Sequence, residues 1–374
     1  MRIVIDARMY GLENTGIGRY TIGLIEGLKR IKTNNKYLVL LRKKYFNQLN
    51  FPSNWKKILV DIDHYSYSEQ IKLPKLLYRL KPDLVHFLHF NVPLLYRDHF
   101  IVTIHDLLMH RQKGVKATTL PAPLYFAKRF AYKIVFDHAI KNSLQIIVPS
   151  KNVKKEIISY YKVPGNKIKI VHEGADIPMI KKGKMTLEKY GLDGKNYFIY
   201  VGNAYPHKNL HRAIKAIFLL NKSLTRRYLL AIVCARNIFI KRLEKDLKSL
   251  KARKFVKLLG FVPDEELGCL YHNSLAMIFP SLSEGFGLPG LEAILSGTIV
   301  CLSDIPVFKE VYAGNALYFD PYNITDIKNS LLKVIKMSRI ERKNLIRKSQ
   351  EFTKKYNWDT MSRETLKIYG QIIK

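Results

Sequence analysis

Two glutamates, Glu284 and Glu292, flank a glycine-rich stretch with the sequence EGFGLPGLE. A buried strand is expected to end before this stretch, at Pro280, and Pro289 suits the first turn of a helix. The free amides and the dipole of a helix that begins here favour a bound phosphate without requiring a metal ion. Continuous helix would separate the two carboxylates by ~12 Å, so each is expected to hold a different part of an extended ligand. The alternative, an exposed glutamate and a helix glutamate that faces solvent, leaves the glycines unexplained.

Lys208 is a second candidate for anion binding, in the segment VGNAYPHKNL at 201–210. This segment follows a predicted strand and opens a helix. A lysine at the start of a helix is disfavoured by the helix dipole unless an anion binds there. The alternative is an ordinary lysine at a helix start, without a ligand.

Candidate binding residues also follow predicted strands in the first half of the chain. Gly16 and Gly18 open a helix after the first strand, where backbone can approach a phosphate closely, but Thr21 replaces the third glycine of the dinucleotide-binding pattern. His105 ends a later strand, at the carboxyl edge of a parallel sheet, where open α/β folds bind their ligands. Alone, the two glycines are a weak signal, and a single histidine is more often structural.

Short apolar strands alternate with helical stretches along the whole chain, which predicts an α/β fold with doubly wound parallel sheets. In the first half the strands are predicted at 2–7, 37–41, 57–60, 84–87, 100–104 and 145–148. In the second half they are predicted at 197–201, 228–233, 256–259, 276–279, 299–302 and 316–319. A polar stretch with glycine and proline near residue 178 is typical of a linker. We therefore predict domains at 1–178 and 179–359, with a final helix at about 360–374 that could pack back on the first domain.

Composition narrows the class of protein. A chain of 374 residues favours two domains over one. The cysteines Cys234, Cys269 and Cys301 are far apart and in no CxxC pair, which argues against a disulfide framework or a zinc site. Asp6 interrupts what would be the apolar part of a signal peptide, and no stretch has the ~20 apolar residues that span a membrane. We therefore expect a cytoplasmic protein.

The charge is strongly basic, with 64 Lys+Arg against 30 Asp+Glu and a net charge of +34. Such a charge attracts an anionic membrane surface or a nucleic acid, but a lysine-rich genomic background explains it equally well. The segment 121–140 mixes aromatic and basic side chains. This mixture is typical of a helix at a membrane interface, and also of a buried helix with a few long lysines at its edge.

The segment FPSLSEGFGLPGLEAILSG at 279–297 resembles the donor-site signature of the retaining glycosyltransferases of family 4, whose fold is GT-B. Glu284 and Glu292 match the E-x7-E pattern of that family. The resemblance implies two Rossmann-like domains that face a central cleft. It also implies that Glu284 contacts the donor sugar and stabilises charge at its anomeric carbon, while Glu292 binds the ribose hydroxyls. The donor phosphates would lie on the backbone of Gly285, Phe286, Gly287 and Leu288.

Other segments follow the family with departures. Lys208 matches a basic residue that binds the donor diphosphate. The arginine that the family carries just after the loop glycine is Asn203 here, so Asn203 lies at a donor-binding position without the charge, and His207 and Arg236 are candidates to replace it. Gly290 stands where many relatives have a second proline.

The resemblance also extends to the first half of the chain. It places Gly16 and Gly18 against the donor phosphate and the acceptor, and His105 against the donor sugar. Asp61 and Asp63 imitate the aspartate pair that holds a metal ion in the other large architecture of glycosyltransferases. We reject that interpretation, because the diphosphate site proposed above consists of amides and a lysine.

The implied function is retaining, metal-independent transfer of a hexose such as mannose, glucose or rhamnose from a nucleotide-diphosphate sugar. The acceptor would be a glycan or a lipid-linked sugar in the synthesis of a cell-surface polysaccharide or glycolipid. We expect no cofactor and no nucleic-acid partner, and a peripheral place on the inner face of the plasma membrane. The alternatives are a nucleotide-sugar epimerase, a glycan phosphorylase, for whose pyridoxal phosphate no lysine signature is seen, and a basic nucleic-acid-binding protein. The last leaves the two glutamates of the anion-binding loop unexplained.

Overall fold

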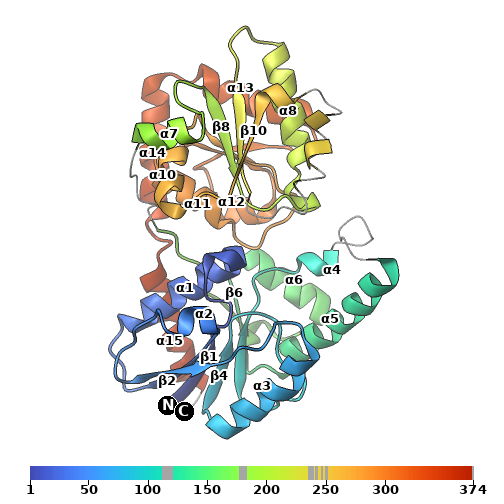
Figure 1. Cartoon of the computed structure of the whole chain (residues 1–374), viewed down its shortest axis with the longest axis vertical. Helices are drawn as coiled ribbons and strands as arrows, with labels where there is room; N and C mark the ends of the chain where they lie inside the picture. Colours follow the sequence, from blue (N-terminus) through green and yellow to red (C-terminus); the bar gives the residue numbers. More distant parts are fainter. Residues whose placement is uncertain are drawn as a thin grey trace. The chain divides into compact units, whose positions relative to one another are not determined.

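The computed structural model of the chain describes residues 1–111, 121–176, 183–234, 240, 243–245, 247–248 and 252–372. Contacts divide the chain into two compact units, Met1–Gly174 with Tyr356–Lys374, and Ala175–Lys355. In each unit a sheet is covered by helices on both faces (Figure 1). The centre of the predicted linker, residues 177–182, lies outside the described residues.

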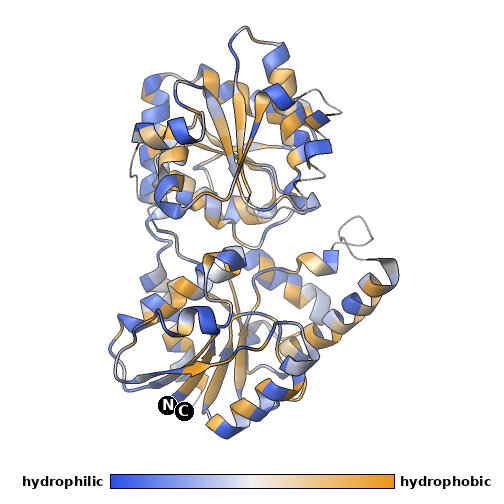
Figure 2. Ribbon diagram, in the orientation of Figure 1, coloured by the Kyte–Doolittle hydropathy of each residue, from blue (hydrophilic) through white to orange (hydrophobic). Residues whose placement is uncertain are grey.

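The sheet of the first unit has seven parallel strands among the described residues, in the order β3-β2-β1-β4-β5-β6-β7. They are β1 (Arg2–Asp6), β2 (Lys36–Leu41), β3 (Trp55–Leu59), β4 (Leu84–Phe87), β5 (Phe100–Thr103), β6 (Gln145–Val148) and β7 (Ile168–Ile170). β4 and β5 are buried along their whole length, as expected for strands covered on both faces. Figure 2 shows these strands as a largely apolar layer. The sequence prediction missed β7, because an apolar pair around one lysine is too short to show a period.

The helices of the first unit begin and end as follows. They are α1 (Thr15–Lys29), α2 (Lys43–Phe46), α3 (Tyr67–Leu80), α4 (Leu108–Arg111), α5 (Ala122–Asn142), α6 (Lys151–Tyr161) and α15 (Trp358–Ile372), with 3₁₀ turns η1 (Leu12–Asn14) and η3 (Gly165–Lys167).

The C-terminal helix α15 packs closely on α1. A Cβ at Gly23 would lie 2.2 Å from the ring of Trp358, and a Cβ at Gly27 would lie 2.1 Å from the hydroxyl of Ser362. The hydroxyl of Tyr369 lies 2.7 Å from Nδ1 of His86 on β4. The final helix therefore completes the core of the first unit, although it follows the whole second unit in sequence.

The sheet of the second unit has six parallel strands in the described part of the chain, in the order β10-β9-β8-β11-β12-β13. They are β8 (Tyr197–Val201), β9 (Leu229–Val233), β10 (Val256–Gly260), β11 (Met277–Phe279), β12 (Val300–Ser303) and β13 (Leu317–Phe319). The other elements are α7 (Gly183–Lys189), η4 (Pro206–Lys208), α8 (Leu210–Lys222), η5 (Arg253–Phe255), α10 (Asp264–His272), α11 (Leu288–Leu295), α12 (Pro306–Tyr312), α13 (Ile324–Lys336) and α14 (Arg339–Thr353). All six strands were predicted from the sequence to within two residues at either end.

α5 covers the sheet with only part of its length. Phe136 is fully buried near its end, whereas Phe126 and Phe130 in its first turns are 59% and 68% exposed. The buried-helix interpretation of this segment therefore holds only for the second half of α5. Among the described residues, no helix combines the length and the apolar character needed to cross a membrane.

Candidate active site

The glycine-rich stretch forms a passage from strand to helix in the second unit. β11 ends at Phe279 and α11 begins at Leu288. Gly287 precedes the helix with a φ of 105°, in the left-handed region that favours glycine. A Cβ at Gly287 would also lie 2.8 Å from the ring of Phe308. The passage places the first amides of α11 beyond the carboxyl end of a buried parallel strand, where α/β folds bind phosphates.

A buried tyrosine holds the start of α11. The hydroxyl of Tyr312, the last residue of α12, donates a hydrogen bond to the carbonyl of Gly287. A Cβ at Gly290 would lie 2.4 Å from that hydroxyl oxygen. Glycine at 290, where many family members have proline, therefore leaves room for Tyr312 to hold the loop.

Lys208 and Glu284 form an ion pair at this passage. Nζ of Lys208 lies 2.6 Å from Oε1 of Glu284, and the two side chains are 16% and 12% exposed. The ammonium group also lies 5.7 Å from the centre of the Phe279 ring at the end of β11. The two charged residues chosen from separate segments of the sequence thus meet in one place, where an anion bound to Lys208 would also lie near Glu284.

Asn209 ties the lysine segment to the ends of two strands. Its backbone has a φ of 59°, a left-handed conformation that asparagine tolerates better than most residues. Its buried amide nitrogen donates to the carbonyls of Pro280 and Pro321, at 3.0 and 2.8 Å, and its oxygen accepts from Arg212 at 2.8 Å. Asn209 was not among the residues predicted from the sequence, although its place directly after the candidate ligand Lys208 was a signal for this positioning role.

His207 does not replace the missing arginine as a cation. Burial, together with the neighbouring charge of Lys208, lowers the pKa of His207 to about 2, so its ring is neutral at physiological pH. Its backbone carbonyl accepts a hydrogen bond from the amide of Leu282 at 2.8 Å, which joins η4 to the loop before α11. Asn203 accepts a hydrogen bond from the hydroxyl of Tyr200 at its carbonyl, at 2.6 Å. The other candidate, Arg236, lies outside the described residues.

Glu292 lies within α11 and is only 4% exposed. The interpretation of this residue as a glutamate that faces solvent is therefore wrong. A buried carboxylate carries a large desolvation cost unless it is paired or bound, and Glu292 has an interaction within the protein. Its role in binding the ribose stays a prediction from the sequence.

His105 is held on both sides within the first unit. Its Nδ1 lies 3.0 Å from a carboxylate oxygen of Glu173, and its Nε2 lies 3.0 Å from the carbonyl oxygen of Leu88. Both partners are acceptors, so the ring satisfies both contacts only as a doubly protonated imidazolium. Burial opposes this charge, but the hydrogen bond and the charge of Glu173 outweigh burial and raise the pKa of His105. Both ring nitrogens of His105 are thus engaged, and its ring lies edge-to-face with that of Tyr20, with the ring centres 4.6 Å apart.

The remaining candidates of the first unit differ in their surroundings. A Cβ at Gly18 would lie 1.9 Å from the carbonyl oxygen of Gly11, so Gly18 is required for packing within the first unit. Gly16 lies at the start of α1 with open space where a side chain would project. Asp61 and Asp63 both pair with Arg42, at 3.4 and 2.8 Å. No three side chains of His, Cys, Asp or Glu in the described ranges come together as metal ligands.

Comparison with known proteins gives two family matches that together span most of the chain. Residues 15–177 match the model of Glycosyltransferase Family 4, and residues 186–352 match that of glycosyl transferases group 1. The chain belongs to the family 4 glycosyltransferases.

Named relatives of this glycosyltransferase are similar along almost their entire length. The O-antigen chain mannosyltransferase RfbU of Salmonella typhimurium is 29% identical, over 96% of this chain and 97% of that protein. The O-antigen chain mannosyltransferase B of Escherichia coli is 24% identical, over 99% of both. Among solved structures, the HepE protein of Anabaena in complex with UDP and glucose has a TM-score of 0.76 at 16% identity, with 99% of this chain and 100% of that chain covered. The solved structure supports the GT-B fold that the sequence predicted.

In this glycosyltransferase the predicted donor residues separate into two groups. Lys208, Glu284 and the start of α11 gather at the carboxyl ends of strands in the second unit, and Asn203 follows the neighbouring strand β8. Gly16, Gly18 and His105 belong to the first unit.

Replacing Glu173 by glutamine is expected to make stability less dependent on pH. The raised pKa of folded His105 means that the ion pair stabilises the fold fully below the unfolded pKa of about 6.5. That contribution is lost as the pH rises through the folded pKa. The Tm of wild type should therefore exceed that of Glu173→Gln most at low pH, with a difference that narrows as the pH rises.

Thermal unfolding from about pH 6 to pH 9 checks this prediction, because the range crosses the usual pKa of histidine. Glu26→Gln is a suitable control, since Glu26 pairs with Lys29 on the surface of α1. A difference in Tm that stays constant over the range would contradict the assignment of a charged His105.

Proposed function

We propose that this glycosyltransferase is a retaining mannosyltransferase that extends a cell-surface polysaccharide, with a nucleoside-diphosphate mannose as donor. The observation that carries the donor site is the Lys208–Glu284 pair beside the start of α11. The choice of mannose is supported by the names of the two bacterial relatives, both described as O-antigen chain mannosyltransferases.

The pair and the helix start have complementary tasks in this proposal. The amides of Phe286, Gly287 and Leu288 and the ammonium of Lys208 bind the pyrophosphate. When the bond between the anomeric carbon and the phosphate oxygen breaks, negative charge grows on the phosphate. Donors that are already oriented stabilise this charge more strongly in the transition state than in the ground state.

The two glutamates act on the sugars of the donor. Glu284, held at 2.6 Å from Lys208, stabilises the positive charge that develops at the anomeric carbon and holds the mannose hydroxyls. Glu292, buried within α11, holds the ribose. These roles follow the resemblance to the family and use the separation of the two carboxylates along the chain.

The configuration of the anomeric carbon is retained if the acceptor oxygen attacks from the same side from which the phosphate leaves. The new bond from the acceptor oxygen to the anomeric carbon forms as the bond to the phosphate oxygen breaks, and that phosphate oxygen takes the acceptor proton. The anomeric proton of the product, observed by NMR, reports the configuration. An inverted product would contradict this step while leaving the transferase assignment intact.

A matrix of donors and acceptors tests the proposed function. Donors are mannose, glucose and rhamnose linked to guanosine, uridine or thymidine diphosphate, and acceptors are octyl glycosides of mannose, galactose, glucose and N-acetylglucosamine. Release of nucleoside diphosphate and mass spectrometry of the octyl product are both recorded. We expect a product with a mannose donor. A folded protein that transfers only another hexose would overturn the choice of mannose, and a free epimerised nucleotide sugar would overturn the transferase reaction.

We further propose that the first turns of α5 bind an anionic membrane surface. Phe126 and Phe130 project there as exposed aromatic side chains, and Lys128 and Lys133 lie on the same stretch of helix. Aromatic side chains with interleaved lysines bind the interface of anionic lipid. In a flotation assay with phosphatidylglycerol vesicles, wild type should float with the vesicles. The variant Phe126→Ser/Phe130→Ser should stay in the bottom fraction. Equal flotation of both proteins would contradict the proposal.

A further inference from the structure

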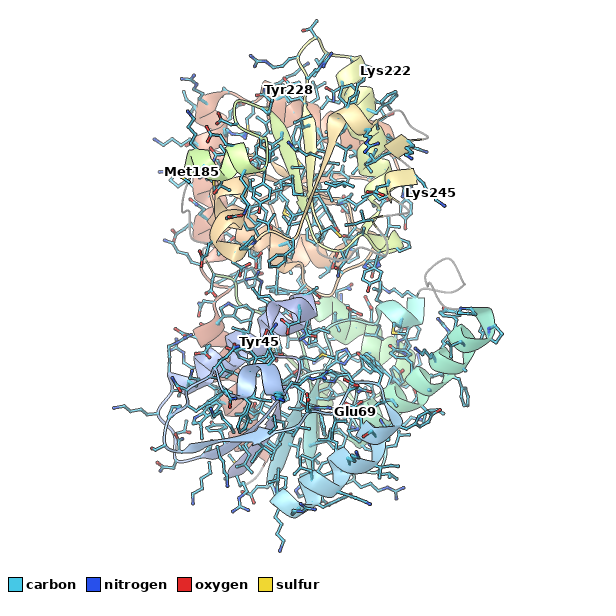
Figure 3. All side chains as sticks on the ribbon, viewed as in Figure 1. Tyr45, Glu69, Met185, Lys222, Tyr228 and Lys245 are labelled. Carbon is cyan, nitrogen blue, oxygen red and sulfur yellow. The ribbon has the colours of Figure 1, made fainter. Side chains whose placement is uncertain are left out.

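A buried cluster of charged side chains lies at the carboxyl ends of β1 and β4 in the first unit. Arg8 contacts both oxygens of Asp6 at 2.7 Å, and its Nη2 also lies 2.7 Å from Oε1 of Glu69. The other oxygen of Glu69 accepts hydrogen bonds from the side chain of Asn91 at 2.5 Å and from the amide of Tyr65 at 2.7 Å. Glu69 lies in the first turn of α3 (Figure 3).

Two nitrogens of this cluster are buried without a hydrogen-bond partner among the described residues. They are Nη1 of Arg8 and Nε2 of His64. Both side chains line one cavity of about 10 Å³, together with Asp6, Leu88, His89 and Asn91. This volume is that of a single water molecule. A buried donor without an acceptor is costly, so the cavity is suited to one oxygen atom that accepts a hydrogen bond from Arg8.

The position of the cavity in the sheet is that of a ligand site. β1 lies between β2 and β4. The chain proceeds from β1 to one side of the sheet through β2 and β3, and to the other side from β4 onwards. Open α/β sheets bind ligands outside the carboxyl ends of the strands at this point of reversal. We call this space the switch-point cavity; its lining residues are Asp6, Arg8, Met9, His64, Leu88, His89 and Asn91.

The charge around the switch-point cavity selects a neutral ligand. Burial opposes ionisation of Asp6, but Arg8 outweighs burial and lowers the pKa of that carboxyl. The pKa of Glu69 is also lowered, because bonding from His64 and the charge of Arg8 outweigh its burial. Burial likewise opposes the charge of Arg8, but the two carboxylates raise its pKa. The guanidinium of Arg8 is already paired with both carboxylates, which disfavours a phosphate or a carboxylate as the ligand and tolerates a hydroxyl group.

The cavity is also connected to His105. Leu88 lines it, and the carbonyl of Leu88 accepts the hydrogen bond from Nε2 of His105 at 3.0 Å. The segment that follows β4 is therefore held by two hydrogen bonds, one from Asn91 to Glu69 and one from His105 to the carbonyl of Leu88. A ligand oxygen in the cavity would meet a rigid wall, as precise orientation of an acceptor requires.

We propose that the switch-point cavity receives a hydroxyl group of the acceptor sugar, which accepts a hydrogen bond from Nη1 of Arg8 in place of a water molecule. The inference rests on the proposed function, because it assigns the acceptor side of that reaction. Each oxygen of a carboxylate accepts two hydrogen bonds, so Oδ2 of Asp6, which accepts one from Arg8, can accept a second one from the same hydroxyl group. The site is specific for an uncharged sugar rather than a phosphorylated one.

The test compares binding of the acceptor and of the donor in variants of the full chain. Arg8→Lys keeps a positive charge between Asp6 and Glu69 but cannot reach them and the cavity at the same time. Losing a hydrogen bond from a charged donor should raise the KM for the octyl glycoside that gives product by about tenfold. The Kd for nucleoside diphosphate, measured by calorimetry, should stay unchanged. Arg42→Lys is the matched control, since Arg42 pairs with two exposed aspartates in the same unit.

A second variant keeps the proposal open to refutation if Arg8→Lys does not fold. His64→Phe removes the other unpartnered nitrogen and narrows the cavity. Residue 64 lies outside the helices and strands. This variant should also raise the KM for the octyl glycoside. An unchanged KM for the octyl glycoside in a folded variant would show that the cavity holds water alone and would overturn the inference. Transfer by wild type to no octyl glycoside from any donor would instead overturn the proposed function and this inference with it.

Discussion

Replacing Glu284 by alanine is expected to reduce transfer by about a thousandfold, the upper part of the range for removal of one charge-stabilising group from an active site. The carboxylate lies 2.6 Å from the lysine assigned to the pyrophosphate, so it is close to both halves of the bond that breaks. Its loss removes stabilisation of the anomeric carbon and a contact to the sugar hydroxyls. Initial rates with saturating donor measure the effect.

Loss of activity in Glu284→Ala must be separated from loss of fold. The two side chains are only 16% and 12% exposed, so loss of one partner is expected to cost more than the ~1 kcal/mol typical of an exposed pair. The Tm of the variant should fall, and activity is therefore measured well below that Tm. Glu351→Ala is the control, since Glu351 also pairs with a lysine but is 71% exposed. A folded Glu284→Ala protein with near wild-type activity would refute the assigned role.

Replacing Lys208 by methionine is expected to weaken binding of nucleoside diphosphate by about 10- to 100-fold, the value of a hydrogen bond that involves a charge. Methionine keeps much of the length of the lysine side chain and its contact with Phe279 while removing the ammonium group. The fall in kcat/KM should be larger than the loss of binding, because negative charge on the phosphate increases in the transition state.

Calorimetry and initial rates on the same preparation check both parts of this prediction. Lys354→Met is the matched control, because Lys354 is an exposed partner of Glu351. The loss of transition-state stabilisation, calculated from kcat/KM, should be much smaller in the double variant Lys208→Met/Glu284→Ala than the sum of the losses in the two single variants. The effects of residues that act as a unit are not additive. Full additivity would mean that the two residues serve separate sites.

The sequence predicted the fold well because the signals for it are local. Alternation of apolar strands with helices is visible in short windows, and every strand except β7 was found in this way. The strand–loop–helix passage at Glu284 was predicted for the same reason, since glycine and proline mark its turns. A three-residue strand that contains a lysine carries too little of the pattern to be recognised.

The contacts that build the site could not be predicted, because they join distant segments. Lys208 meets Glu284 through the neighbouring position of β8 and β11 in the sheet, and no spacing in the sequence reveals it. From the sequence, His207 was a candidate to replace the missing arginine, but its burial in the fold lowers its pKa and leaves the ring neutral.

The same limit applies to the acceptor side. In the sequence, Asp6 argued only against a signal peptide, whereas the fold places it beside Arg8 and close to Glu69 at the switch-point cavity.

A crystal structure of the protein with a nucleoside diphosphate is the sharpest test of the proposed donor site. We expect the pyrophosphate to lie on the amides of Phe286, Gly287 and Leu288, with Nζ of Lys208 turned from Glu284 toward a phosphate oxygen. Ligand bound elsewhere in the protein, with the start of α11 empty and the Lys208–Glu284 pair intact, would contradict it.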